Sequence, residues 1–269
     1  MTLLCPLCGA VLRREENRYI CPNRHSFDVA RQGYVNLLTV QQKHSLHPGD
    51  TREQVLSRRA FLEAGFYAPI VEALISAARE FGCEGPILDV GCGEGYYSSR
   101  LAKALDAPLL GLDISKDAVR CASASYKDAT WVCATASKLP VEDGSVGLLT
   151  SLFALTLPEE FRRVLAKDGF YFQVLAAQDH LMGLKNIIYP EIKLRDKDSS
   201  PELPGFESVK SLPIRFEFTV RGAQVQQLLG MTPHTFRISK AGAEALAATD
   251  VLTDTASCVL NVYRPAAFR

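Results

Sequence analysis

The sequence lacks long hydrophobic runs: no apolar stretch approaches the roughly 20 residues that a transmembrane helix needs. Its first residues, Met1-Thr-Leu-Leu-Cys-Pro, also lack the basic start and apolar segment of a secretory signal. Net charge is missing too, because 30 basic residues are balanced by 30 acidic ones. This balance argues against a protein that coats nucleic acid through a strong positive field, although it leaves room for a local basic patch. We expect a cytoplasmic protein with no membrane partner.

Repeats and low-complexity segments are also absent from the 269 residues, and 47% hydrophobic with 22% charged residues is an ordinary globular composition. Eight cysteines then need explaining in a reducing compartment, where disulfides are rare. Five of them are scattered among apolar or small neighbours and are expected to be buried as small hydrophobic residues. The other three cluster in the first 25 residues.

Cys5, Cys8, Cys21 and His25 follow the spacing C-x2-C-x12-C-x3-H. Two close pairs of such ligands, separated by an insert of hairpin length, can close a tetrahedron around Zn²⁺. Four protein ligands leave no position for water, so the predicted zinc is structural. A redox Cys-x-x-Cys is the alternative, but the preceding strand and following helix of a thioredoxin-like site are not indicated.

Short apolar strands alternate with helices from residue 85 onward, after a helical stretch over Arg52–Phe81 with breaks near Gly65 and Pro69. This alternation predicts an α/β, Rossmann-like fold with a seven-stranded, mostly parallel sheet and a small N-terminal zinc-binding module. The expected division is a zinc module at 1–35, a linker at 36–52 and the main domain at 53–269. The expected strands are Pro86–Val90, Pro108–Leu112, Thr130–Ala134, Val146–Phe153, Gly169–Leu175, Leu212–Val220 and Ala256–Tyr263.

A glycine-rich turn, with Gly91, Gly93 and Gly95, follows the first strand and opens a helix. Glycines let the backbone turn tightly and approach a ligand where a Cβ would clash. Taken alone, the turn could bind a dinucleotide. Asp89 precedes the first glycine by two residues, and Asp113 ends the next strand, where a carboxylate can accept hydrogen bonds from two ribose hydroxyls.

This arrangement resembles motif I and the following acidic motif of class I S-adenosylmethionine methyltransferases. Two later segments resemble further motifs of that class: residues 138–145, beginning Lys-Leu-Pro, and residues 161–169, Phe-Arg-Arg-Val-Leu-Ala-Lys-Asp-Gly. The helix start after Gly95 can then favour the methionine carboxylate. The sequence departs from the class at Thr135, where an acid often reads the adenine amino group.

The zinc spacing joined to this fold is similar to the bacterial 23S rRNA (guanine-N1)-methyltransferases, some of which confer macrolide resistance. The segments that carry this similarity span nearly the whole chain and are 21–28 (CPNRHSFD), 33–38 (GYVNLL), 48–50 (PGD), 58–67 (RRAFLEAGFY), 180–185 (HLMGLK) and 231–233 (MTP). The resemblance implies that S-adenosylmethionine is the methyl donor and that the zinc module recognises a hairpin of 23S rRNA.

The resemblance also implies that Tyr67, Tyr97, Ser98 and His180 line the cofactor pocket. Each has an ordinary alternative, since the two tyrosines can be core aromatics and His180 a helix-cap residue. Arg58 and Arg59 can be phosphate contacts or a solvated helix face. A homodimer, in which two zinc modules grip one hairpin, is a further possibility.

The implied reaction requires N1 of guanine to lie in line with the methyl group and the sulfur. An acceptor should help remove the N1 proton, and the base must lie in a loop or be flipped out onto an aromatic side chain. Asp50, Asp179 and Glu191 are acids in suitable loops, but the spacing selects none, so the catalytic residue is unassigned. The alternatives are methylation of tRNA or a small molecule, and a zinc-dependent RNA-binding protein without turnover.

Overall fold

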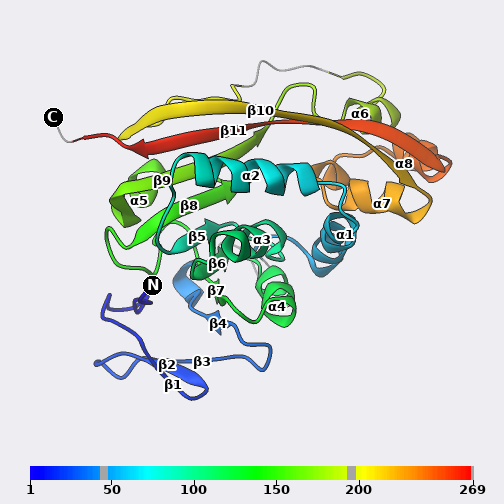
Figure 1. Cartoon of the computed structure of the whole chain (residues 1–269). Coiled ribbons are helices and arrows are strands. Elements are labelled where there is room, and N and C mark those ends of the chain that lie inside the picture. Colours follow the sequence, from blue (N-terminus) through cyan, green and yellow to red (C-terminus); the bar gives the residue numbers. More distant parts are fainter. Residues whose placement is uncertain (43–47, 193–197, 268–269) are drawn as a thin grey trace.

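The computed structural model describes residues 1–42, 48–192 and 198–267. Its dominant feature is an eight-stranded sheet with the strand order β10-β11-β9-β8-β5-β6-β7-β4 (Figure 1). Only β11 runs antiparallel to its two neighbours, and the other pairs are parallel. The strands are β4 (Val35–Asn36), β5 (Ile87–Val90), β6 (Leu109–Asp113), β7 (Thr130–Cys133), β8 (Val146–Leu152), β9 (Leu165–Ala176), β10 (Phe206–Arg221) and β11 (Val251–Pro265).

The sheet has one strand more than the seven predicted. The additional strand, β4, pairs in parallel with β7, and the N–H of Leu37 donates to the carbonyl of Cys133 at 2.8 Å. Two residues are too few for the period-2 alternation that reveals a strand in a sequence. The predicted Rossmann-like, mostly parallel α/β architecture is otherwise confirmed.

Helices pack on this sheet in the predicted alternation. The first, α1 (Arg52–Glu63), begins at a capping box: Thr51 Oγ1 accepts from the N–H of Gln54, whose side chain accepts from the N–H of Thr51. The others are α2 (Ala68–Glu80), α3 (Tyr96–Leu105), α4 (Lys116–Ser125), α5 (Pro158–Val164), α6 (Met182–Ile188), α7 (Ala223–Gly230) and α8 (Lys240–Ala247), with 3-10 turns η1 (Val40–Gln42) and η2 (Pro233–Phe236).

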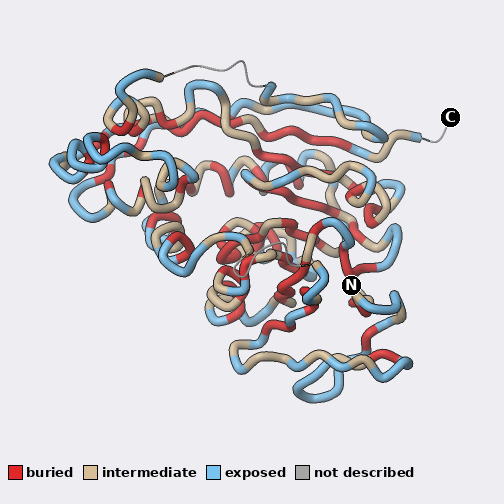
Figure 2. The backbone as a smooth tube through the Cα atoms, turned by 180° about the vertical axis from the view of Figure 1, so that it is seen from behind, coloured by how far each residue is buried: buried red, intermediate tan, exposed pale blue. Residues whose placement is uncertain are grey.

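The N-terminal residues form a small antiparallel sheet of β1 (Arg13–Glu15), β2 (Arg18–Ile20) and β3 (Ser26–Asp28). This segment is largely exposed, whereas the central strands of the large sheet are buried (Figure 2). Its few buried side chains, Leu3, Cys5, Leu12 and Cys21, belong to the hydrophobic cluster on one face of the large sheet. The N–H of Leu4 also donates to the carbonyl of Pro140 at 2.8 Å. The N-terminal segment therefore shares its core with the large sheet.

Several predicted boundaries differ from the observed ones, and β9, β10 and β11 all extend beyond the predicted strands. The sequence pattern predicts a helix over 179–188, but α6 begins only at Met182, because Leu181 has the left-handed φ of 56°. Strand β8 ends at Leu152 rather than Phe153, whose φ of 54° cannot continue a strand. The sequence also predicts a turn over 47–50 and a loop over 196–206, of which residues 47, 196 and 197 lie outside the described residues.

Within the described part of the chain, no single helix is long and apolar enough to cross a membrane; α1 and α2 meet that test only as a pair, with a 75° bend between them.

Candidate cofactor site and metal centre

The predicted glycine turn joins β5 to α3 at the carboxyl edge of the sheet. Gly91, Gly93 and Gly95 have positive φ angles of 79°, 55° and 85°, which side-chain-bearing residues rarely adopt. Space is also limiting, because a Cβ at Gly95 would lie 2.5 Å from the Trp131 ring and one at Gly91 would lie 2.7 Å from Ala154 Cβ. The turn is therefore packed closely against its neighbours, and its amides are used within the fold: those of Gly91 and Cys92 donate to the Leu112 carbonyl, at 2.8 and 3.0 Å.

Asp113 ends β6 beside this turn, as its spacing predicts. Its Oδ2 accepts from the N–H of Gly93 at 2.9 Å and its Oδ1 accepts from the N–H of Ser115 at 2.8 Å. Burial raises the pKa of the carboxyl, and the two amide hydrogen bonds oppose that shift. Each oxygen keeps a further lone pair, so the carboxylate is fixed in direction and can still accept hydrogen bonds from a diol.

Asp89 lies on β5 and is buried, as is Ser98 in the first turn of α3. The Asp89 carboxyl accepts from Thr150 Oγ1 at 2.7 Å. Burial raises its pKa to about 6, against the lowering effect of the Thr150 hydrogen bond. Glu94, in the turn itself, is also buried, and burial raises its pKa to about 7 although the Arg58 guanidinium lowers it. The turn is thus surrounded by carboxyl groups.

Tyr67 and His180 contact each other across the pocket, with 3.4 Å between Tyr67 Oη and His180 Nε2. His180 Nδ1 accepts from the N–H of Ser257 at 3.1 Å, so in the neutral ring the proton sits on Nε2 and donates to Tyr67. His180 is not the cap of α6, since that position is Leu181. Tyr67 is 2% exposed, and burial raises its pKa well above the usual value.

Tyr97 completes this aromatic cluster from α3. Its ring lies 6.5 Å from that of Phe153, which in turn lies 6.1 Å from the His180 ring. Burial raises the pKa of Tyr97 well above its usual value. The structure therefore brings Tyr67, Tyr97 and His180 together and adds Phe153, a residue that the sequence placed at the end of a strand.

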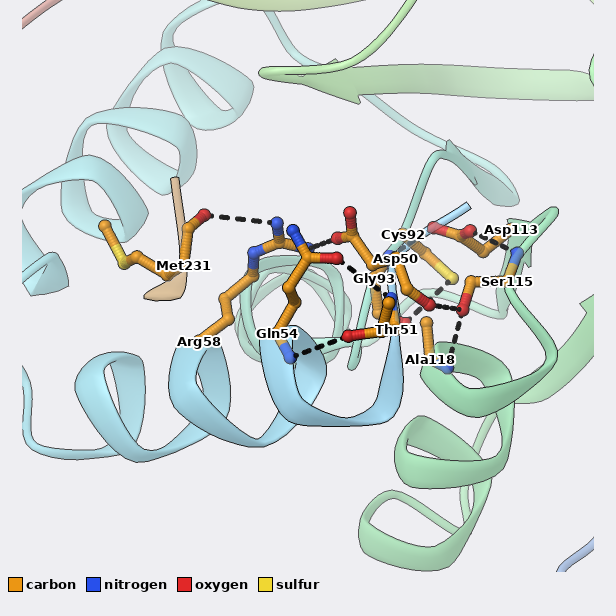
Figure 3. A network of polar contacts seen from close by, with 10 residues as sticks. All are labelled: Asp50, Thr51, Gln54, Arg58, Cys92, Gly93, Asp113, Ser115, Ala118 and Met231. Carbon is orange, nitrogen blue, oxygen red and sulfur yellow. Dashed lines mark hydrogen bonds and ion pairs between the residues drawn. The ribbon is translucent and has the colours of Figure 1, made fainter. Parts of the chain in front are cut away.

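Arg58 points from α1 toward the glycine turn (Figure 3). Its guanidinium donates to Asp50 Oδ2 at 2.5 Å and to the Met231 carbonyl at 3.3 Å, and a Cβ at Gly93 would lie 3.6 Å from its Nη1. The Asp50 carbonyl accepts in turn from Ser115 Oγ at 2.7 Å. Arg58 is therefore part of the site rather than of a solvated helix face. Arg59 points elsewhere, to Cys121 Sγ at 3.4 Å.

Two of the three acids that the sequence offered as possible bases are paired with arginines. Asp50 pairs with Arg58, and Asp179 pairs with Arg215. A hydrogen bond from Ser257, together with Arg215, lowers the pKa of Asp179, which makes it a weaker base. Glu191 is exposed. Thr135, the weak adenine candidate, exchanges hydrogen bonds of 3.2 Å with Ser137 instead.

The four predicted zinc ligands converge, and their donor atoms lie within 4.8 Å of one another. Cys8 Sγ lies 3.7 Å from Cys21 Sγ, and His25 Nδ1 lies 3.4 Å from Cys5 Sγ and 3.5 Å from Cys21 Sγ. A zinc tetrahedron with bonds of about 2.3 Å to sulfur and about 2.0 Å to nitrogen has edges of about 3.8 and about 3.5 Å. Hydrogen bonds, chiefly from the Ala10 amide, lower the pKa of Cys8 to about 6 and favour its thiolate. The donor set fits structural Zn²⁺.

The sheet order, the glycine turn and the acid at the end of β6 define an S-adenosylmethionine-dependent methyltransferase of class I. A "Methyltransferase domain" family model matches residues 87–169. Among solved structures, a provisionally assigned type II methyltransferase from Anaeromyxobacter dehalogenans shares the fold: the TM-score is 0.52 at 19% identity, over 71% of this chain and 95% of that one.

The particular family follows from the N-terminal segment and from the curated relatives. A zinc-ribbon model described as "RlmA, N-terminal" matches residues 3–46. The 23S rRNA (guanine(748)-N(1))-methyltransferase of Streptomyces fradiae is 34% identical, over 87% of this chain and 85% of its own length. A Bacillus subtilis protein provisionally assigned as a 23S rRNA (guanine-N(1)-)-methyltransferase is 30% identical, over 85% of both chains. The chain belongs to the family of 23S rRNA (guanine-N1)-methyltransferases.

Proposed function

We propose that this protein transfers a methyl group from S-adenosylmethionine to N1 of a guanine in a hairpin loop of 23S rRNA, in the bacterial cytoplasm. The observation that carries the proposal is the presence of two sites in one chain: a Cys/Cys/Cys/His cluster with the spacing of a zinc site, and a glycine turn flanked by Asp89 and Asp113. The names of the full-length relatives support the same reaction.

The charges around the glycine turn suit a cationic cofactor. Asp89 and Glu94 are buried and Asp113 is half-buried beside the turn. Three carboxyl groups, those of Asp50, Glu94 and Asp113, interact with one arginine, Arg58. When bound, S-adenosylmethionine supplies a sulfonium-activated methyl group. We assign the two ribose hydroxyls to Asp113, and the methionine carboxylate to Arg58 and the amides at the start of α3.

The remaining cofactor contacts are assigned to Tyr67, Tyr97 and His180. Because Nε2–H of His180 donates to the Tyr67 hydroxyl oxygen, the hydroxyl proton of Tyr67 remains available to donate to a ligand. Ser98 is assigned to the same pocket and is fully buried in the first turn of α3, close to Asp89. Among the described residues, none of the three candidate acids is singled out as the general base: Asp50 and Asp179 are paired with arginines, and Glu191 is exposed. The catalytic residue therefore stays unassigned.

We infer a division of labour between the two sites from the positions of their residues along the sequence. Residues 1–35 carry the zinc ligands Cys5, Cys8, Cys21 and His25 and are assigned to rRNA recognition, residues 36–52 connect them, and residues 53–269 hold the cofactor. A homodimer, with two zinc modules on one hairpin, stays a prediction that sedimentation of the protein with and without rRNA would test.

The test is a strain that lacks this gene. Mass spectrometry of digested 23S rRNA should reveal the loss of a single N1-methylguanosine, and plasmid-borne expression should restore it. Unchanged rRNA in the deletion strain would contradict the proposal, and a loss confined to tRNA or to a small metabolite would favour those substrates instead.

A further inference from the structure

The residue that directly follows β8 occupies the position where open α/β sheets bind their ligands. From β5, the chain first adds β6 and β7 on one side of the sheet and then returns to add β8 and β9 on the other side. The order of the strands therefore reverses between β5 and β8. Ligands of such sheets lie outside the carboxyl ends of the strands at this reversal. Phe153 begins the loop there, and the next residue, Ala154, touches the glycine turn at Gly91.

Phe153 is held in a conformation that is unfavourable for a bulky L-residue. Its φ is 54°, in the left-handed region, and its N–H donates to the Val174 carbonyl at 2.9 Å. Such residues persist where the surrounding structure enforces them, and they concentrate at functional sites. The left-handed φ ends β8 at Leu152, so Phe153 stands outside the strand.

The ring of Phe153 lies between two cofactor-pocket residues and still remains accessible. It is inclined by 31° to the His180 ring and by 50° to the Tyr97 ring. The residue is 40% exposed, whereas Leu152 before it is 9% exposed. Leu155, two residues further, is 51% exposed. An accessible aromatic face therefore adjoins the place where a methyl group would be presented.

We propose that Phe153 stacks on the guanine that is to be methylated, once that base has left the RNA stack. The inference rests on the proposed function and names the surface that holds its substrate. N1 lies on the pairing edge of guanine, so the enzyme must receive an unpaired base, and unpaired bases are commonly held by stacking on aromatic side chains. Stacking binds the face of the base and leaves the N1 edge free to point at the methyl group.

Substitutions that keep or remove the aromatic ring test this role. Phe153→Leu should lower kcat/KM for 23S rRNA by about 5- to 150-fold, the loss expected for one base stack, with the Kd for S-adenosylmethionine unchanged. Phe153→Tyr should retain activity within about threefold, because any aromatic face can stack. Phe170→Leu is the matched control: Phe170 lies in β9, and its half-buried ring packs on Phe81. This variant should leave kcat/KM for rRNA and the Kd for S-adenosylmethionine unchanged.

A contact readout separates stacking from a structural effect. In an rRNA fragment that carries 2-aminopurine at the methylated position, Phe153→Trp should quench the fluorescence of the bound fragment relative to wild type, because an indole in contact quenches that base. Equal fluorescence in the two proteins, or a Phe153→Leu enzyme that loses cofactor affinity but keeps its KM for rRNA, would overturn the inference. If the wild-type enzyme does not methylate 23S rRNA at all, the proposed function itself has failed.

Discussion

At the scale of single residues, the cofactor site works through hydrogen bonds that are already formed before any ligand arrives. Asp113 is fixed by two backbone amides, and His180 by the amide of Ser257. Groups held in this way need little reordering when a cofactor binds, so more of the interaction energy appears as affinity. Arg58, paired with Asp50, is prepared in the same manner.

Removing the ribose acid tests that assignment. Asp113→Ala should weaken S-adenosylmethionine binding by about 2–3 kcal/mol, because a pair of charge-assisted hydrogen bonds is lost. Isothermal titration calorimetry measures the change. Asp117→Ala, which removes an exposed acid paired with Arg120 on α4, is the control and should bind normally. Equal affinities for both variants would show that Asp113 does not hold the ribose.

The raised pKa of Glu94 gives a stability test whose sign can be worked out. The pKa of this carboxyl is near its ordinary value of 4.5 in the unfolded chain and is raised to about 7 in the folded protein, because burial disfavours the charge. Between these values the folded state binds more protons, so this group's contribution to stability is present below pH 4.5 and is lost as the pH rises to 7. The free energy of unfolding of Glu94→Gln relative to wild type should therefore rise by on the order of 2 kcal/mol between pH 5 and 7.5. Urea titrations at several pH values measure it, and a pH-independent difference would refute the shift.

Spacing in the sequence was sufficient for residues whose role depends on local backbone chemistry. The glycines of the turn, Asp113 and the four zinc ligands are fixed by short-range patterns, and the structure places them together. Arg58 and Phe153 are different. Arg58 and Arg59 are neighbours on one helix, so only the packing of α1 decides which of them faces the glycine turn. The left-handed φ of Phe153 leaves no trace in an apolar run that reads as a continuing strand.

At the scale of secondary-structure elements, β4 links the zinc ribbon to the methyltransferase sheet. It adds an edge strand next to β7, and Leu37 directly after it is 1% exposed in the shared core. The sequence could not reveal this strand, since its pairing depends on a partner that lies about a hundred residues away. The sequence predicts a linker from residue 36 onward. The structure shows that this residue belongs to β4, which joins the zinc ribbon to the large sheet.

A core substitution beside β4 measures how strongly the ribbon is attached. Leu37→Ala should lower the free energy of unfolding by about 2–4 kcal/mol, as expected for a buried leucine that leaves a cavity. Val40→Ala, three residues on and 84% exposed, should change it by less than about 0.5 kcal/mol. Chemical denaturation of both variants provides the measurement. Similar values for the two would mean that the ribbon is not anchored through this segment.

At the scale of the whole molecule, the buried metal ligands and the aromatic residues of the cofactor site belong to two different hydrophobic clusters. The zinc ligands lie at the β1–β3 end, and the glycine turn lies at the carboxyl edge of the large sheet (Figure 1). Two functions placed in this way should be separable by mutation, because loss of the metal unfolds the ribbon first.

Cys8→Ser makes that separation. The variant should release zinc, lose most of its affinity for 23S rRNA and bind S-adenosylmethionine almost as tightly as wild type. Cys83→Ser, which changes a cysteine outside the cluster, should retain metal and RNA binding. Atomic absorption, filter binding and calorimetry give the three readouts. If zinc-free protein still binds RNA, the ribbon only stabilises the fold and does not recognise the RNA.

The central claim is that one chain uses a zinc ribbon and a class I site to place a methyl group on a guanine of the large ribosomal RNA. Its most direct test combines purified protein, methyl-labelled S-adenosylmethionine and 23S rRNA from a strain that lacks the gene. The account predicts that about one methyl group per rRNA molecule is incorporated and is recovered as N1-methylguanosine from a loop, in line with the need for an unpaired base. Label on another base or another guanine atom, or no label from protein that binds both zinc and cofactor, would contradict it.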